Sequence, residues 1–263
     1  MKYSIEVALL PLLGDILPKV YFEKINKSIC DVAKSPEPSS RTSYPEWWTD
    51  IPRYVSSENS QIPFLNHRAN ATIRNCPSVN DSMNFGYTIY LPFDLYLDAR
   101  DSDNLLWYVP EIDTSVLDNK SGENHLIAWN SERDVQSFCI PDGYHKVVLK
   151  LNTLWGIKTE DGYSSWITQP MYRSDLPILA MDGIIDTDRY PSRFPHVFFV
   201  KSGFSGIIKS STPVLQVIPF KREEYTSEIV DLDIEDVKKN HRIEGSTFSS
   251  FYKKNFWTRK RFI

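Results

Sequence analysis

The alternation of apolar and polar residues along the chain predicts many short β-strands. Apolar side chains recur at every second position from Tyr3 to Leu9, and Pro11 and Gly14 end this pattern. From residue 87 onward, short runs of β-branched and aromatic residues follow one another with turn residues between them. These predicted strands cover residues 87–91, 93–97, 105–109, 126–129, 147–151, 155–158, 164–168, 178–179, 183–185, 197–200, 206–208 and 214–218. Such regular spacing is typical of a mainly β barrel or sandwich, and the first two of these strands are expected to form a hairpin that bends at Pro92.

Three regions depart from the strand pattern. Residues 35–60 are rich in Ser, Pro and Glu, which predicts an extended arm, and its aromatic side chains are expected to anchor it. A short helix is expected to begin at Pro77, because proline suits a first helical turn, and to stop at Gly86. After residue 231 apolar residues recur at helical spacing twice, which predicts two C-terminal helices.

The chain has 263 residues and no Gly/Ser-rich or long charged stretch that would divide it. This length is near the upper limit for one hydrophobic core, so we expect one domain with appendages. The predicted division is a β-rich core domain over residues 1–230, including the arm at 35–60, and a C-terminal helical clasp over residues 231–263.

Net charge and cysteine content bear on the binding partners and the cellular compartment of the protein. A formal net charge of −4 creates no overall field that would attract nucleic acid or an anionic membrane. The three cysteines, Cys30, Cys76 and Cys139, are odd in number and widely spaced, which fits buried free thiols in a reducing cytosol. The apolar run from Val7 to Leu13 is too short to span a membrane and has acidic flanks unlike those of a signal peptide. We therefore expect neither secretion nor membrane insertion.

No complete catalytic or metal-binding motif is present in the sequence. Asp98, Asp101 and Asp103 crowd one loop but lack the glycine and the distal glutamate of a calcium loop. The five histidines show no metal-binding spacing, and the nucleophile-elbow, phosphate-loop and dinucleotide motifs are missing. The sequence predicts no metal, no cofactor and, on balance, no enzymatic activity.

The last residues of the chain interleave basic and aromatic side chains. This pattern could bind nucleic acid through charge and base stacking, but the patch is short. Its helical spacing favours an amphipathic helix that docks on the protein itself or on a neighbour. The predicted interaction anchors, from this tail and from the arm, are Trp47, Trp48, Tyr54, Phe256 and Trp257.

The most specific motifs of the sequence lie between residues 161 and 218. They are Asp161 to Ile167, Tyr172-Arg173-Ser174, Gly183-Ile184-Ile185-Asp186-Thr187-Asp188, Gly206 to Lys209, and Pro213-Val214-Leu215-Gln216-Val217-Ile218. Together they resemble the β-clip fold of dUTPases and dCTP deaminases. The resemblance implies a β-clip-like core in which Arg173 and Ser174 face phosphate, Asp186 orients water and Gln216 lies near the pocket. The contexts of Arg173 and Gln216 depart from that family, and no glycine-rich C-terminal arm follows, so the resemblance predicts fold rather than activity. From the residues alone, Asp186 and Asp188 also fit a turn between strands.

A second set of motifs is spread over the whole chain. It consists of Cys76-Pro77, Trp155-Gly156, Gly162-Tyr163, Gly183 to Asp188, and Gln216 to Phe220. On these motifs the chain resembles a group of uncharacterised phage and bacterial proteins. This resemblance implies a phage protein located in the virion or the host cytoplasm. The main hypothesis is a non-enzymatic virion or assembly component that contacts other phage proteins or associates with itself as a homo-oligomer. The alternative is a dUTPase-like protein that binds or hydrolyses nucleotides, or one that sequesters a host nucleotide.

Overall fold

The protein is built from antiparallel strands that join segments far apart in the sequence. The computed structural model describes residues 17–24, 36–40, 44–55, 70–110, 127–130, 140–190, 196–239 and 251–262. The predicted strand at 3–9, two of the three cysteines (Cys30 and Cys139) and three of the five histidines (His67, His125 and His241) lie outside these residues.

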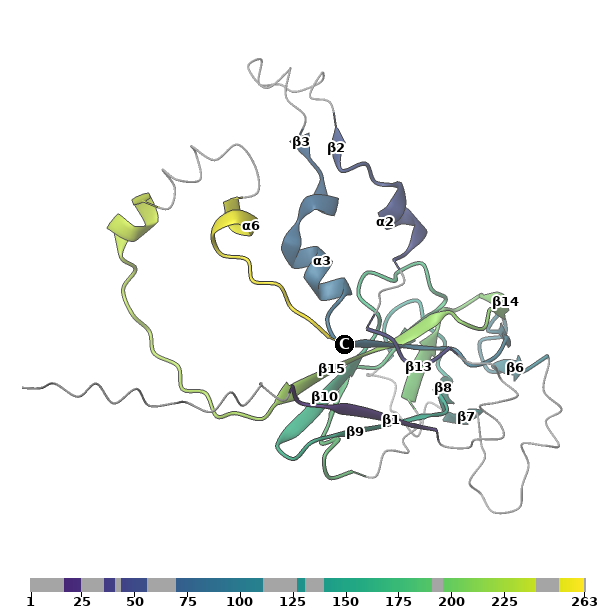
Figure 1. The fold of residues 1–263 in the computed structure, drawn as a ribbon. Coiled ribbons are helices and arrows are strands. Elements are labelled where there is room, and N and C mark those ends of the chain that lie inside the picture. Colours follow the sequence, from purple (N-terminus) through teal and green to yellow (C-terminus); the bar gives the residue numbers. More distant parts are fainter. Residues whose placement is uncertain are drawn as a thin grey trace, which may run out of the picture.

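One of two four-stranded sheets has the order β12-β10-β15-β4. Its strands are β4 (Tyr87–Tyr90), β10 (Tyr163–Thr168), β12 (Gly183–Ile185) and β15 (Pro213–Lys221). The long strand β15 lies between β10 and β4 and pairs antiparallel with both. The other edge of β10 carries the short strand β12. This sheet positions the candidate site (Figure 1).

Two further sheets and two strand pairs complete the β structure. One sheet has the order β11-β13-β8-β7, and the other has the order β14-β5-β6. Their strands are β11 (Ile178–Ala180), β13 (His196–Val200), β8 (Val148–Leu151), β7 (Ile127–Asn130), β14 (Ser205–Ile208), β5 (Leu95–Asp98) and β6 (Leu106–Tyr108). The pairs are β1 (Val20–Lys24) with β9 (Trp155–Thr159), and β2 (Tyr54–Val55) with β3 (Asn70–Ala71).

A single hydrophobic core lies between the three larger sheets. Each sheet contributes fully buried side chains, for example Ile89, Leu97 and Phe198. The long strand β15 is buried at every position from Pro213 to Ile218, so both of its faces are covered there. The mainly β prediction is confirmed. Every sheet formed by the described strands ends in two edge strands, so they make no closed barrel.

The predicted hairpin of residues 87–91 and 93–97 is wrong. β4 pairs with β15, whereas β5 pairs with β14 and β6. Pro92 and Phe93 form a bend between the two strands. Because proline has a fixed φ and no amide donor, it turns the chain from one sheet into another instead of continuing a ladder.

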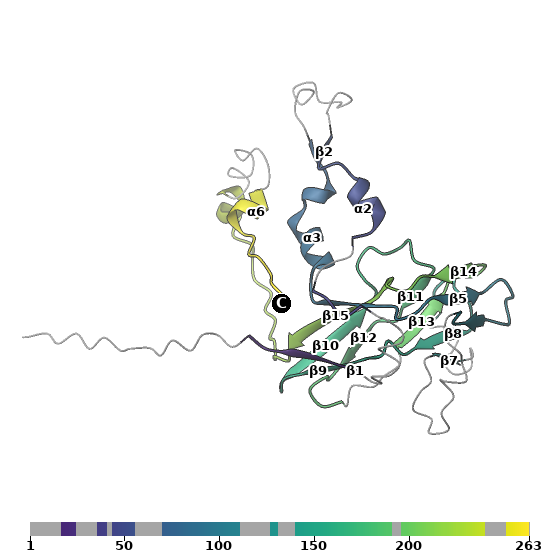
Figure 2. The ribbon, with the colours of Figure 1, turned by 45° about the vertical axis from the view of Figure 1, so that its right-hand side comes forward.

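The helices are short and lie outside the core. α3 (Pro77–Met83) begins at proline and stops before Gly86, as predicted. The segment expected to be an extended arm contains the short helix α2 (Glu46–Asp50), whose Trp48 side chain is buried. Figure 2 shows α2 and α3 on the same side of the β-sheets. No described helix has the length and apolar character that a membrane span requires.

The C-terminal part leaves the sheet after β15 and returns to it at its end. Residues 222–233 have no regular structure, residues 234–239 are helical, and α6 (Phe251–Asn255) follows. Residues 257–262 then run back toward α3 and the edge of β4 (Figure 1).

Candidate functional site

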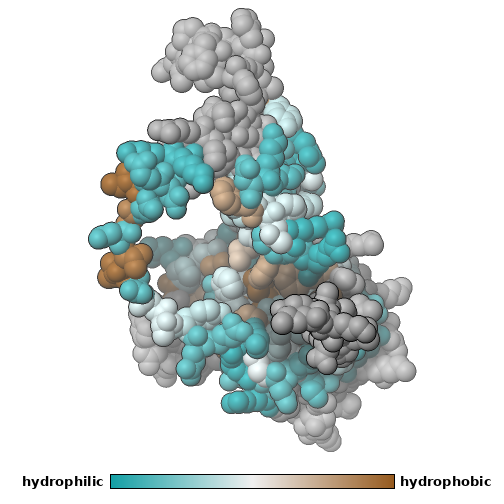
Figure 3. Space-filling view, turned by 60° about the vertical axis from the view of Figure 1, so that its left-hand side comes forward, coloured by the Kyte–Doolittle hydropathy of each residue, from teal (hydrophilic) through white to brown (hydrophobic). Residues whose placement is uncertain are grey.

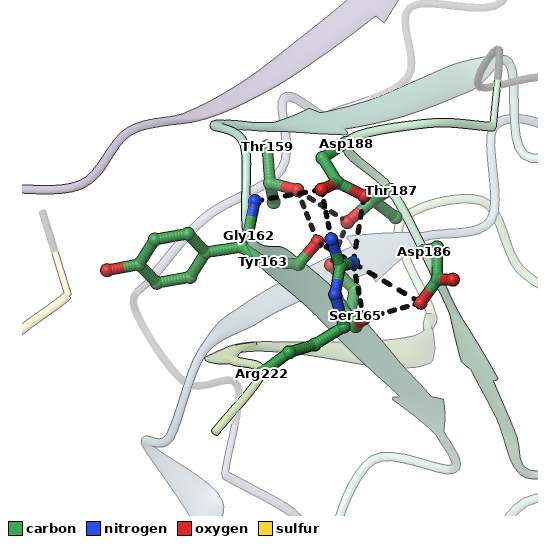
Figure 4. A network of polar contacts seen from close by, with 9 residues as sticks. Thr159, Gly162, Tyr163, Ser165, Asp186, Thr187, Asp188 and Arg222 are labelled. Carbon is green, nitrogen blue, oxygen red and sulfur yellow. Dashed lines mark hydrogen bonds and ion pairs between the residues drawn. The ribbon is translucent and has the colours of Figure 1, made fainter. Parts of the chain in front are cut away.

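The segment after β12 is a tight turn that carries two aspartates. The amides of Arg189 and Tyr190 both donate to the carbonyl oxygen of Asp186, at 3.0 and 2.9 Å. The turn that the sequence suggested is therefore present. However, the carboxylates of Asp186 and Asp188 bond across to the neighbouring strands, not to their own backbone (Figure 4).

Asp188 forms a buried ion pair with Arg222, which follows directly after β15. Arg222 Nη1 donates to Asp188 Oδ1 at 2.9 Å, and Arg222 Nη2 donates to Asp188 Oδ2. The amide of Gly162 donates to Asp188 Oδ2 at 2.8 Å. The Asp188 side chain is only 3% exposed. The hydrogen bonds from Arg222, with that from Gly162, hold the pKa of Asp188 far below its usual range.

Asp186 belongs to the same network but faces solvent. Its Oδ1 accepts from Ser164 Oγ at 2.7 Å and from Arg222 Nη1 at 3.3 Å. Arg222 Nη1 also reaches the carbonyl oxygen of Tyr163 at 2.9 Å. Because the Asp186 side chain is 52% exposed, it is the only one of the two carboxylates that a solute can approach.

A buried cluster of hydroxyl groups lies behind the ion pair. Thr187 Oγ1 is 2.8 Å from Thr159 Oγ1 and 3.0 Å from Ser165 Oγ. Thr159 Oγ1 also donates to the carbonyl oxygen of Tyr163 at 3.2 Å. The Asp186–Arg222 network thus comprises Thr159, Gly162, Tyr163, Ser164, Ser165, Asp186, Thr187, Asp188 and Arg222. It ties together β9, β10, the turn after β12 and the end of β15, so its first role is structural.

Next to this network lies a mostly apolar cavity of about 560 Å³, which we call the tyrosine cavity. Thr159 and Tyr163 belong to both. Tyr21, Tyr87 and Tyr163 contribute to the walls of the cavity, together with Phe262. The cationic residues Lys19 and Arg261 line it as well. The remaining lining residues are Leu17, Pro18, Val20 and Pro219.

The C-terminal segment closes one side of the tyrosine cavity. The Phe262 ring packs edge-on against Phe85 and Tyr87, with centroids 4.8 and 5.9 Å apart. Upstream, Trp257 Nε1 donates to Asp81 Oδ2 at 2.7 Å, and Lys260 Nζ lies 2.9 Å from the same oxygen. Burial raises the pKa of Tyr87, so its hydroxyl stays neutral. The tail therefore docks on α3 and β4 of its own chain.

Gln216, predicted to lie near a nucleotide pocket, is buried and fully engaged with the backbone. Its Oε1 accepts from the Met171 amide at 3.0 Å. Its Nε2 donates to the carbonyl oxygens of Ser82 and Phe85, at 2.9 and 2.7 Å. Both amide hydrogens are used, so this side chain has no donor left for a ligand.

Arg173 and Ser174 lie elsewhere, along an open groove of about 660 Å³ that neither Asp186 nor Gln216 lines. Arg173 is paired with Asp175, at 2.9 Å from Nε to Oδ1 and 2.8 Å from Nη2 to Oδ2. The carbonyl oxygen of Ser174 accepts from Lys201 Nζ at 2.9 Å.

Asp186 and Gln216 are also separated from each other along the sheet. Gln216 is level with Thr168 of β10, whereas Asp186 bonds Ser164, four residues along the same strand. At about 3.3 Å per residue, this places them roughly 13 Å apart along the strand direction. The structure does not gather the four predicted residues into one pocket.

The predicted anchors differ in their surroundings. Trp48 is 3% exposed and stacks with Tyr44, with centroids 6.3 Å apart. Trp47 is 37% exposed and donates from Nε1 to the carbonyl oxygen of Tyr172 at 3.3 Å. Tyr54 and Phe256 are exposed, and Trp257 is half-buried against Asp81. Trp47, Tyr54 and Phe256 are thus the members of this set with exposed side chains.

The acidic loop and the described histidines have structural partners. Asp98 pairs with Arg100, which lowers the pKa of Asp98 to about 2. His145 accepts at Nδ1 from the Val147 amide, so Nε2 carries the proton and donates to the carbonyl oxygen of Asp101 at 2.8 Å. Burial lowers the pKa of His196 to about 3, which keeps its ring neutral. In the described part of the chain, no three His, Cys, Asp or Glu side chains are placed to hold a metal ion.

Sequence reasoning identified Asp186 and Asp188 but missed Arg222 and the tyrosine cavity. Arg222 lies four residues beyond the last predicted strand, 214–218, and a cation this close to a strand end was the available signal. The cavity has no comparable local signal, because residues 17–21 and 261–262 meet only in the folded chain.

Comparison with known proteins gives a distant likeness of fold. No protein-family model and no curated protein sequence matches the chain. Two solved structures of the dUTPase from phage phi11 of S. aureus are similar to it, each with 10% sequence identity and a TM-score of 0.34. The likeness covers 82% of this chain and 97% or 96% of theirs. One structure, of a mutant, is described for its coordination of a structural Mg(II) ion, and the other for a species-specific insert. At this identity and TM-score, the likeness assigns no role to any residue of this chain.

Proposed function

We propose that the protein binds a nucleotide, with its planar base and its anionic phosphate, in the tyrosine cavity and does not turn it over. The observation that carries this proposal is the combination of three tyrosines, one phenylalanine and two cations around one open, mostly apolar space. Small-molecule sites are typically concave and apolar, with a few polar groups that orient the ligand. The volume of about 560 Å³ suits a ligand of nucleotide size.

The lining offers the two kinds of contact that a nucleotide needs. A base can stack on the tyrosyl rings or on Phe262, because every base has a π face. Lys19 and Arg261 can pair with phosphate oxygens, and the guanidinium of Arg261 can do so with two parallel hydrogen bonds. The neutral hydroxyl of Tyr87 adds a group that can donate or accept a hydrogen bond.

Binding is favoured over hydrolysis by the state of the neighbouring carboxylates. Asp188 is buried and ion-paired, and its low pKa makes it a poor general base. Asp186 is exposed, but Ser164 and Arg222 already use one of its oxygens. The network therefore supplies support for the cavity wall and no activated nucleophile. A virion or assembly role, expected from the resemblance to phage proteins, stays a prediction.

Binding can be tested by calorimetry and thermal unfolding with a panel of ribonucleotides, deoxynucleotides and the matching nucleosides. A ligand at one hundred times its dissociation constant stabilises the folded state by about 2.7 kcal/mol. We expect stabilisation by nucleotides, weaker stabilisation by nucleosides, and recovery of the ligand intact. No heat and no stabilisation with any nucleotide would refute the proposal.

Two pairs of variants localise the site. Arg261→Gln should weaken nucleotide binding, whereas Arg259→Gln, in the same segment but outside the cavity lining, should not. Tyr163→Ala should weaken binding, whereas Tyr225→Ala, which is 84% exposed and does not line the cavity, should not. Equal effects within a pair would place the ligand elsewhere.

A further inference from the structure

The segment after β15 stands away from the domain. We call residues 223–236 the acidic arm. Its anchor is Arg222, whose amide donates to the carbonyl oxygen of Gly162 at 2.9 Å and whose side chain holds Asp188. Beyond it, no hydrogen bond or ion pair joins residues 224–236 to any other element that the structure describes. Figure 3 shows the chain arching away from the domain, with apolar side chains on the arch.

The acidic arm combines exposed apolar side chains with strong negative charge. Ile229, Val230, Leu232 and Ile234 are between 61% and 102% exposed. From Val230 to Asp233, before the helical residues 234–239, apolar and acidic residues alternate, which is the period of an extended segment with one apolar and one acidic face. The arm contains seven acidic residues and no Lys or Arg. Exposed apolar residues in such a row are typical of an interaction site.

A positively charged segment with exposed aromatic side chains lies near the end of the same chain. We call residues 252–261 the basic segment. It holds five Lys or Arg residues and no acidic one. Two of its aromatic side chains, Tyr252 and Phe256, are 43% and 58% exposed. Charge and apolar character therefore complement the acidic arm. Among the described residues, however, the two regions are joined by no hydrogen bond or ion pair.

We propose that the acidic arm of one copy docks on the basic segment of a second copy. Arg222 fixes the start of the arm at the Asp186–Arg222 network, whereas Trp257 fixes the basic segment at Asp81 of α3. Each copy thus presents one arm and one acceptor, and a reciprocal exchange satisfies both in a closed, symmetric dimer. The contact covers the exposed apolar side chains of the arm, and the paired charges set its orientation. The basic segment shares Arg261 with the tyrosine cavity, but Lys253 and Lys254 do not line that cavity, so the inference can be tested apart from nucleotide binding.

Self-association can be followed by light scattering and sedimentation over a range of protein concentration and salt. We expect a concentration-dependent dimer at low salt that dissociates as salt screens the paired charges. A labelled peptide of residues 222–237 should bind the intact protein, and a scrambled peptide of the same composition should bind less. A protein that stays monomeric at low salt and does not bind the peptide would overturn the proposal.

Charge reversal gives the sharper test. The double variant Glu228→Lys/Asp231→Lys should lose self-association, and so should Lys253→Glu/Lys254→Glu. Mixing the two should restore a heterodimer, because the reversed arm then meets a reversed acceptor. Glu37→Lys/Asp142→Lys changes the net charge by the same amount at exposed acids outside the arm, and it should associate like the parent protein. Dimers that survive arm reversal, or a mixture that stays monomeric, would refute the arm exchange.

The apolar face of the arm has its own control. Leu232→Ser should weaken self-association, whereas Leu106→Ser, which removes a leucine of comparable exposure from β6, should leave it unchanged. Equal effects of the two substitutions would argue against docking through the arm.

Discussion

Gln216 joins three parts of the chain, and its removal should destabilise the protein whether or not a ligand is present. In Gln216→Leu the side-chain volume is roughly kept while three hydrogen bonds are lost. The amide of Met171 and the carbonyl oxygens of Ser82 and Phe85 then remain without these partners. Ser82 is in the last turn of α3, where carbonyl groups have no partner within the helix.

The magnitude follows from the number of bonds. Each intramolecular hydrogen bond contributes about 1 kcal/mol net, and a buried polar group left unpaired costs about 1 to 3 kcal/mol. Because Gln216 is only 2% exposed, water cannot easily replace it. We expect a loss of about 3 kcal/mol in the free energy of unfolding, which is a large share of the 5 to 15 kcal/mol typical of a folded domain.

Urea unfolding, followed by tryptophan fluorescence and circular dichroism, measures this loss. With a slope of about 3 kcal/mol/M for a chain of this length, the midpoint should fall by about 1 M. Thr168→Val is the matched control, because Thr168 lies directly opposite Gln216 on β10 and is also buried. Its hydroxyl makes no hydrogen bond to any described residue, so this variant should change stability by less than about 1 kcal/mol.

Gln216→Glu adds a pH signature. It keeps an acceptor for Met171 but brings a carboxyl group to two carbonyl oxygens. Its folded-state pKa should be raised, because only the protonated form can donate there. A raised pKa gives stability that is lost as pH rises, so this variant should be less stable at pH 8 than at pH 5, relative to the parent. A Gln216→Leu protein as stable as the parent would refute the reasoning.

Three further predictions concern the backbone, acid stability and the C-terminal tail. Gly86→Ala would place a Cβ 2.1 Å from the carbonyl oxygen of Val217, so it should lower the free energy of unfolding by well over about 3 kcal/mol or prevent folding. Gly162 has a similar positive φ but open space around it, so Gly162→Ala should lower the free energy of unfolding by about 1 kcal/mol. The urea midpoints of the two variants measure this difference. The lowered pKa of His196 predicts that the free energy of unfolding falls as the pH drops from 6.5 to about 3, because the unfolded chain binds the proton first. The lowered pKa of Asp188 predicts a further fall below about pH 4. Asp188→Asn should remove this further fall, and Asp142→Asn should not. Trp257→Ala should speed tryptic cleavage within residues 253–261 while leaving the thermal midpoint of the core nearly unchanged, and equal cleavage rates in the variant and the parent would contradict docking through Asp81.

Local sequence patterns predicted most elements and little of their pairing. The strands after residue 87 and helix α3 were placed from period-two alternation, from Pro77 and from Gly86, because these signals act within a few residues. The hairpin failed because pairing depends on what a strand buries. β4 joins β15, more than a hundred residues away, where Ile89 and Val217 share one core.

The candidate site, too, was predictable from the sequence only in part. Local patterns were enough to place Asp186 and Asp188 in a turn after a strand and to identify the tail as basic and aromatic. The pairing of Asp188 with Arg222, the support that Gln216 gives to α3, and the cavity enclosed by residues 17–21 and 261–262 became apparent in the folded chain. Periodicity and turn preference belong to neighbouring residues, whereas partners and cavities arise when distant segments bury their side chains together.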